Sequence, residues 1–131
     1  MRAFRSFRLM LLTCWMLCAV PAWAEWLAVF EQSDAVYYID TASILKDGNL
    51  RKVWSIKNLK QRDKDGAMSY QIRSGYDCKE QRRWILSVSS RSAPMAGGKV
   101  IHAGKPNSEW NDMPSAGGFE VLMKVVCGKV G

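Results

Sequence analysis

Short runs in which apolar and polar residues alternate dominate the chain after residue 24. Successive side chains of a β-strand point to opposite faces, so a two-residue period predicts strands. Runs of this kind cover residues 50–57, 69–77 and 82–90. Short runs rich in apolar, aromatic or β-branched residues predict further strands at 25–30, 36–39 and 99–103, and turn residues or loops separate all of these runs. Because the connections are short, we expect an antiparallel sheet of about five to six strands with one polar face.

The apolar residues of the longer runs define the sheet face that we expect to form the core. They are Trp54 and Ile56, then Tyr70, Ile72 and Tyr76, then Trp84, Leu86 and Val88. The opposite face of the 50–57 run would carry Arg51, Val53, Ser55 and Lys57. We therefore interpret Trp26, Trp54 and Trp84 as core residues rather than as an exposed stacking platform. Trp110 lies in a polar segment, and we expect it to be an exposed contact.

The period changes near the end of the chain. Apolar residues at positions i, i+3, i+4 and i+7 of residues 118–127 form one helical stripe. These are Phe119, Leu122, Met123 and Val126. Ser115 is a candidate cap and Gly128 a candidate C-terminal stop. The chain is thus predicted to be a single α+β domain with one C-terminal helix on the sheet.

The first 24 residues have the pattern of a secretory signal. Arg2, Arg5 and Arg8 precede an apolar run over residues 9–20, and small residues stand at the two positions that a signal peptidase reads. Twelve apolar residues in a helix span about 18 Å, short of the roughly 30 Å of a membrane core. We predict a signal peptide over residues 1–24 with cleavage after Ala24, and a mature domain over residues 25–131. No cysteine in the signal follows the small residue that lipid attachment requires, so we expect no membrane anchor.

Cleavage changes both the charge and the cysteine count. The chain has 19 basic and 12 acidic residues, and the signal removes three arginines and no acid, which leaves a net charge of +4. This weakly basic balance gives no nucleic-acid signature. Of the four cysteines only Cys78 and Cys127 remain, and in an exported protein they have each other as partners. A disulfide is the favoured interpretation, and two free buried thiols are the alternative.

A basic stretch supplies the candidate binding surface. Between residues 51 and 64 there are six cations and one acid. The candidate binding residues are these six together with two arginines near Cys78 and the loop tryptophan: Arg51, Lys52, Lys57, Lys60, Arg62, Lys64, Arg82, Arg83 and Trp110. Such cations attract sulfated glycans, acidic protein segments or anionic lipid. The alternative is a solvated strand face whose lysines discourage pairing between sheet edges.

Catalytic and metal-binding patterns are weak. His102 is the single histidine, with no Cys-x-x-Cys pair or nucleophile motif beside it, so we predict no metal, no cofactor and no enzyme activity. The carboxylates show no spacing typical of an acid/base pair. Asp40 is better explained as a cap of residues 41–44, and Asp77 as a turn residue or a charge partner of Arg82.

Taken in order, the residues of the mature chain resemble the surface-adhesin protein E family of bacterial envelope proteins. The matching positions are Trp26, Phe30, Tyr38-Ile39-Asp40, Ser43-Ile44, Asp47-Gly48, Arg51-Lys52-Val53-Trp54, Tyr76-Asp77-Cys78, Arg82, Leu86-Ser87, Met95, Gly97-Gly98, Trp110, Pro114 and Leu122 to Cys127. The resemblance implies an α+β domain whose C-terminal helix is pinned by the disulfide. It also implies an adhesin that captures host matrix or serum proteins such as vitronectin and laminin.

This chain departs from the family's namesake, a lipoprotein, by lacking an anchor cysteine. Its expected location is the periplasm, the cell surface or the medium. The expected partner is a protein of the host matrix or an acidic glycan, and a dimer is compatible with the sequence. The alternative function is a periplasmic structural or inhibitory protein without an adhesive role.

Overall fold

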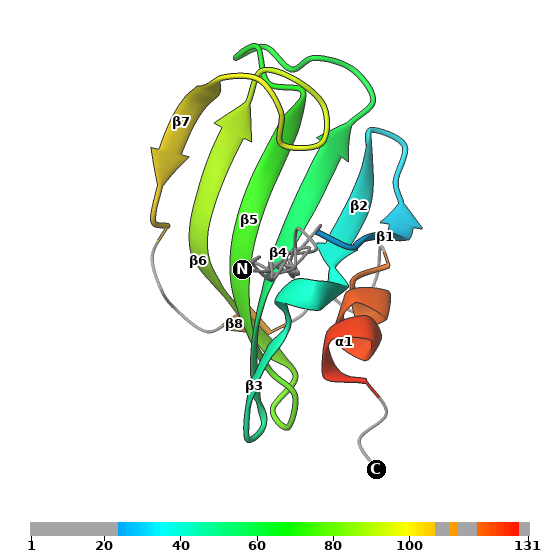
Figure 1. Ribbon diagram of the computed structural model, residues 1–131. Helices are drawn as coiled ribbons and strands as arrows, with labels where there is room; N and C mark the ends of the chain where they lie inside the picture. Colours follow the sequence, from blue (N-terminus) through cyan, green and yellow to red (C-terminus); the bar gives the residue numbers. More distant parts are fainter. Residues whose placement is uncertain (1–23, 107–110, 113–117, 129–131) are drawn as a thin grey trace, which may run out of the picture.

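The computed structural model describes residues 24–106, 111–112 and 118–128 (Figure 1). It contains a twisted antiparallel sheet, one turn of 3₁₀-helix and one α-helix. The elements in chain order are β1 (Trp26–Glu31), β2 (Ala35–Asp40), η1 (Thr41–Ser43), β3 (Leu45–Asp47), β4 (Leu50–Leu59), β5 (Ser69–Asp77), β6 (Arg82–Arg91), β7 (Val100–Gly104), β8 (Asn111–Asp112) and α1 (Phe119–Cys127).

Within the described residues the sheet has eight strands. Six of them are neighbours in the order β1-β2-β4-β5-β6-β7, while β3 pairs with β4 and β8 pairs with β6. All the pairings are antiparallel, as predicted, because short turns connect the main strands. The predicted number of five to six strands is too low. The two missed strands are three and two residues long, too short to show an alternating pattern.

The hydrophobic core lies between α1 and one face of the sheet, which we call the helix face. Ile39, Val53 and Tyr76 contribute from β2, β4 and β5, and each is at most 1% exposed. Leu122 and Val126 complete the core from α1. Phe119 and Met123 pack around it, so the predicted helical stripe is confirmed. The helix begins after Gly118 and ends at Gly128, as expected for a glycine C-cap; Ser115 lies outside the described residues.

The predicted assignment of sheet faces is wrong at two places. Val53, assigned to the polar face, lies in the core, whereas Trp54 and Ile56 point to the other face of the sheet, which we call the open face. In β6 a bulge pairs Arg73 with Ser87 but Ser74 with Ile85. Leu86 is therefore an extra residue, and the alternation shifts by one at this point. As a result Trp84 and Val88, predicted to share one face, lie on opposite faces.

The prediction that three tryptophans lie in the core is also wrong. Trp26, Trp54 and Trp84 are only partly buried, and the core cluster contains none of them. The reason is that α1 covers the face defined by Val53, and not the face that carries the larger aromatic rings. A two-residue period separates the faces of a strand, but it does not say which face a helix will cover.

One end of the open face is covered by the loop of residues 92–98 (Figure 1). The Met95 amide donates to Asn58 Oδ1 at 2.8 Å, and the Ala96 amide donates to Ser69 Oγ at 2.9 Å. The Ser69 hydroxyl in turn donates to the Ala93 carbonyl. Ile56, next to Asn58 in this part of the sheet, is fully buried. This loop therefore covers only the end of the open face near Asn58 and Ser69.

The predicted disulfide between Cys78 and Cys127 is confirmed, with Cα atoms 5.8 Å apart. It joins the turn after β5 to the last residue of α1. A nine-residue helix is too short to be stable alone, so packing and this bond together keep α1 on the sheet.

Candidate binding surface

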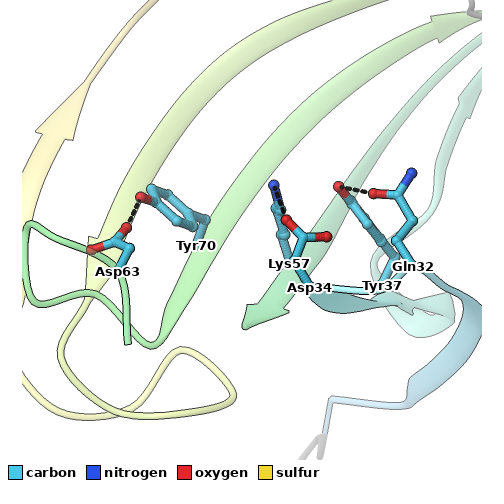
Figure 2. A network of polar contacts seen from close by, with 6 residues as sticks. All are labelled: Gln32, Asp34, Tyr37, Lys57, Asp63 and Tyr70. Carbon is cyan, nitrogen blue, oxygen red and sulfur yellow. Dashed lines mark hydrogen bonds and ion pairs between the residues drawn. The ribbon is translucent and has the colours of Figure 1, made fainter. Parts of the chain in front are cut away.

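Two of the predicted binding cations, Lys57 and Lys60, lie beside carboxylates. Lys57 Nζ is 4.0 Å from Asp34 Oδ2 and 5.9 Å from the centre of the Tyr37 ring (Figure 2). Lys60 Nζ forms an ion pair with Glu31. These pairs are partly exposed, so each contributes at most about 1 kcal/mol to stability. They nevertheless offset part of the positive charge that the basic stretch would present to a partner.

Arg62 and Lys64 lie in the loop that joins β4 to β5. Arg62 holds this loop against the next one, because its Nη1 donates to the carbonyl oxygens of Gly66 at 2.7 Å and Ser92 at 2.8 Å. Lys64 is exposed. Arg62 therefore has a structural role that the sequence did not indicate, whereas Lys64 remains available for contacts.

The same loop is organised by Asp63. Its Oδ1 accepts hydrogen bonds from the amides of Asp65 and Ala67 at 2.9 Å each, and its Oδ2 accepts one from the Tyr70 hydroxyl (Figure 2). The Tyr70 hydrogen bond is the main cause that lowers the pKa of Asp63. The same hydrogen bond to Asp63, together with partial burial, raises the pKa of Tyr70 to about 12. The loop is thus fixed to β5 by a charge-assisted hydrogen bond.

Tyr70 also lines a groove of about 440 Å³ on the β5–β7 side of the helix face. Val88 also lines it, as do the polar residues Asp65 and His102. His102 is exposed on β7, consistent with its place in an edge strand. The groove combines apolar and polar lining residues, which suits contact with a side chain of another molecule.

Arg51 and Lys52 are adjacent in β4 and point to opposite faces. Arg51 lies on the helix face, and its Nη1 donates to the carbonyl oxygens of Gly48 at 2.7 Å and Leu50 at 2.9 Å. Lys52 is exposed on the open face, across from Gly75 of β5. The two cations therefore cannot contact the same ligand surface.

Arg82 and Arg83, which follow the turn after Cys78, also point to opposite faces of the sheet. Arg82 Nη2 lies 4.0 Å from Asp77 Oδ2, the charge partner predicted for it. Arg83 is paired across the sheet with Tyr76 on the helix face. Burial raises the pKa of the Tyr76 phenol, and Arg83 acts in the opposite direction.

The nine predicted binding residues therefore do not form one continuous patch. Three of them, Arg51, Lys57 and Arg83, lie on the helix face. Lys52 and Arg82 lie on the open face, and the loop cations lie beyond the end of β4. Trp110 lies outside the described residues. A binding role for the cations of residues 51–64 stays a prediction, and the described contacts leave Lys52 and Lys64 as the most accessible of them.

Sequence reasoning missed three cations of the open face: Arg73, Arg91 and Lys105. They come from β5, from β6 and from the residues after β7, so no local run of charge marks them. The signal that was available is the alternation of β5, which placed Gln71 and Arg73 together on the face opposite Tyr70 and Ile72. Only the strand order brings the three cations and Lys52 to one face.

The carboxylates considered for catalysis have structural roles. Asp40 Oδ1 accepts hydrogen bonds from the Ala42 amide at 3.1 Å and from the Glu25 amide at 3.0 Å, so the predicted cap is confirmed. Asp77 Oδ1 accepts from the amides of Lys79 and Glu80. In the part of the chain that the structure describes, no three His, Cys, Asp or Glu side chains are grouped so that they could hold a metal ion.

Comparison with known proteins defines the class. The family model described as "Surface-adhesin protein E" matches residues 26–128, which is nearly all of the described fold. The chain therefore belongs to the surface-adhesin protein E family, as its sequence resemblance implied. Membership favours a binding protein over an enzyme. The comparison with curated proteins gives no match.

Solved structures of protein E from Haemophilus influenzae share the fold. Crystal form II is 16% identical, with a TM-score of 0.56, and the match covers 79% of this chain and 96% of that one. The selenomethionine form is 13% identical, with a TM-score of 0.56 and coverages of 77% and 91%. At this identity the likeness establishes the fold and leaves the ligand open. Of the helices in the described ranges, none is long and apolar enough to cross a membrane.

Proposed function

We propose that this protein is exported to the bacterial envelope, where it captures a macromolecule of the host matrix or serum, of the vitronectin or laminin type. In this proposal residues 1–24 direct export and are removed, and residues 25–131 form the binding domain without a membrane anchor. The family match over residues 26–128 is the observation that carries the proposal.

The disulfide and the fixed loops of the domain are compatible with a location outside the cytoplasm. The bond between Cys78 and Cys127 forms and persists in oxidising compartments. Hydrogen bonds of Asp40, Asp63 and Asp77 fix the turns and loops around the sheet. A rigid scaffold that presents side chains from loops and sheet faces suits recognition of a large partner.

The proposed contact surface includes the exposed cations of residues 51–64. Lys64 at the loop tip and Lys52 on β4 are its accessible members, and ion pairs moderate Lys57 and Lys60. Cations at the rim of an interface mainly accelerate association with an acidic partner. We therefore expect weak, salt-sensitive capture of an acidic segment.

The first experiment is fractionation of native cells together with the intact mass of the recovered protein. A species that begins at Glu25, two mass units lighter than its reduced form, and that is cleaved by protease added to intact cells supports the proposal. The same species confined to the periplasm would contradict adhesion. It would favour the alternative, a structural or inhibitory protein of the periplasm.

Ligand capture is tested separately on purified protein with immobilised vitronectin and laminin. Retention that falls as salt rises, and that falls in the Lys64→Gln variant, supports the basic surface. Retention that is insensitive to both changes would refute its role.

A further inference from the structure

The open face of the sheet carries two neighbouring hollows beyond the loop of residues 92–98. One, of about 490 Å³, is lined by Lys52, Arg73, Trp84, Leu86, Ser87, Lys105 and Pro106. The other, of about 440 Å³, includes Trp54, Gln71, Ser89 and Arg91, and it shares Ser87 and Lys105 with the first. The two hollows share lining residues and are therefore neighbours, and together we call them the open-face trough.

The charge of this trough is one-sided. Among the residues that the structure describes, its lining contains four cations, namely Lys52, Arg73, Arg91 and Lys105, and no Asp or Glu. Within the described residues none of these four cations is ion-paired with a carboxylate, whereas Lys57, Lys60 and Arg82 elsewhere are. The remaining polar lining consists of hydroxyl and amide groups, which hydrogen-bond neutral oxygens. The trough is thus complementary to a ligand that carries both anionic and hydroxyl groups.

Two indole rings give the trough apolar surface. The Arg73 guanidinium lies 5.2 Å from the centre of the Trp54 ring, within the range of a cation–π contact. The Trp84 ring packs against the backbone of β5 at Gly75, where a Cβ would come within 2.9 Å of the ring atom Cε3. Both rings keep partial exposure. The electron-rich faces of such rings suit the C–H groups of a sugar ring.

Several of these side chains are held in place before a ligand arrives. Arg91 Nη2 donates to Gln71 Oε1 at 2.9 Å, and its Nε donates to Ser89 Oγ at 3.3 Å. Arg73 is oriented by Trp54, as described above. Side chains already ordered lose less conformational entropy on binding.

The dimensions favour a chain rather than a single small molecule. From Gln71 to Gly75 the trough runs about 14 Å along β5, at roughly 3.4 Å per residue. Across the sheet it reaches from β4 to the residues after β7, which is three strand spacings or about 14 Å. The cations are spread over this area, so anionic groups at several positions of a polymer can be contacted together.

We propose that the open-face trough binds a sulfated polysaccharide, with Lys52, Arg73, Arg91 and Lys105 contacting sulfate and carboxylate groups and Trp54 and Trp84 contacting sugar rings. This adds a ligand class to the proposed protein capture. It shares Lys52 with the surface proposed for protein capture but does not include the loop cation Lys64, and it does not depend on export or on a host protein partner.

The test measures binding of a size-defined heparin oligosaccharide to the purified protein by calorimetry at 0.15 M salt. The variant Lys52→Gln/Arg73→Gln/Lys105→Gln removes three trough cations and leaves Arg91, which also supports its neighbours. The matched control Lys46→Gln/Lys99→Gln/Lys124→Gln removes three exposed cations outside the trough lining. Thermal unfolding of both variants verifies the fold.

We expect the trough variant to bind at least tenfold more weakly and the control to stay within twofold of the unchanged protein. The Trp54→Leu substitution keeps the charge constant, and we expect it to weaken binding at least threefold. An equal loss in both triple variants would overturn the proposal, because binding would then depend on net charge alone. Failure of the unchanged protein to bind at millimolar concentration, or equal binding of a single-stranded oligonucleotide of the same charge, would also overturn it.

Discussion

Removal of the disulfide is the perturbation whose size the structure defines best. Cys78 and Cys127 are separated by 49 positions, and the loop that they close holds β6, β7, β8 and α1. In the chain-entropy model a closed loop of about 50 residues restricts the unfolded chain by roughly 4 kcal/mol at 25 °C. A domain of this size has a free energy of unfolding of about 5–15 kcal/mol, so the bond supplies a large share of it.

The assay is urea unfolding of the oxidised protein, the reduced protein and the Cys78→Ala/Cys127→Ala variant, followed by circular dichroism. With a slope of about 1.5–2 kcal/mol per molar urea, the expected loss lowers the midpoint by about 2–3 M. The melting temperature should fall by about 15–30 °C. Because the effect acts mainly on the unfolded chain, the folded variant should keep the native spectrum.

Reduction must leave the Cys78→Ala/Cys127→Ala variant unchanged, which separates loss of the bond from other effects of the reductant. A loss below about 1 kcal/mol in both the reduced protein and the variant would refute the reasoning. It would mean that packing of α1 alone fixes the C-terminal segment, and that the unfolded chain gains little freedom from the open loop.

Three further predictions concern single side chains. Leu122→Ala should lower the free energy of unfolding by about 2–4 kcal/mol in urea titrations, because it opens a cavity under α1, while Leu122→Met should cost less than about 1.5 kcal/mol. Gly118→Ala should cost about 1–3 kcal/mol in the same assay, because Gly118 has φ of 86° and a Cβ there would come within 2.6 Å of Phe30 Cδ2; an unchanged midpoint would contradict this contact. The pKa of Tyr70 is raised from 10 to about 12 by Asp63, so the stability that this hydrogen bond contributes is complete below pH 10 and is lost between pH 10 and 12. Tyr70→Phe should therefore flatten the fall of the urea midpoint over this range, and an unchanged alkaline slope would contradict the assignment.

The main strands and the helix could be predicted from the sequence, because each depends on neighbouring residues. Alternation of side chains, together with short apolar runs, indicated the six main strands within one or two residues, and the four-residue apolar stripe indicated α1. Asp40 was identified as a cap because its side chain reaches an amide two positions away. The disulfide was predicted from the two cysteines outside the predicted signal peptide, and the structure brings Cys78 and Cys127 together.

The tertiary structure decided which sheet face α1 covers and which side chains meet on the other face. Both faces of β4 carry apolar residues, so the pattern could not distinguish Val53 in the core from Trp54 outside it. The bulge at Leu86 reverses the faces of the rest of β6, and an inserted residue leaves no mark in a short alternating run. The trough cations come from separate strands and meet only through long-range pairing, which local sequence does not encode. For the same reason the run of cations at residues 51–64, dense in the sequence, divides between two faces and a loop in the folded protein.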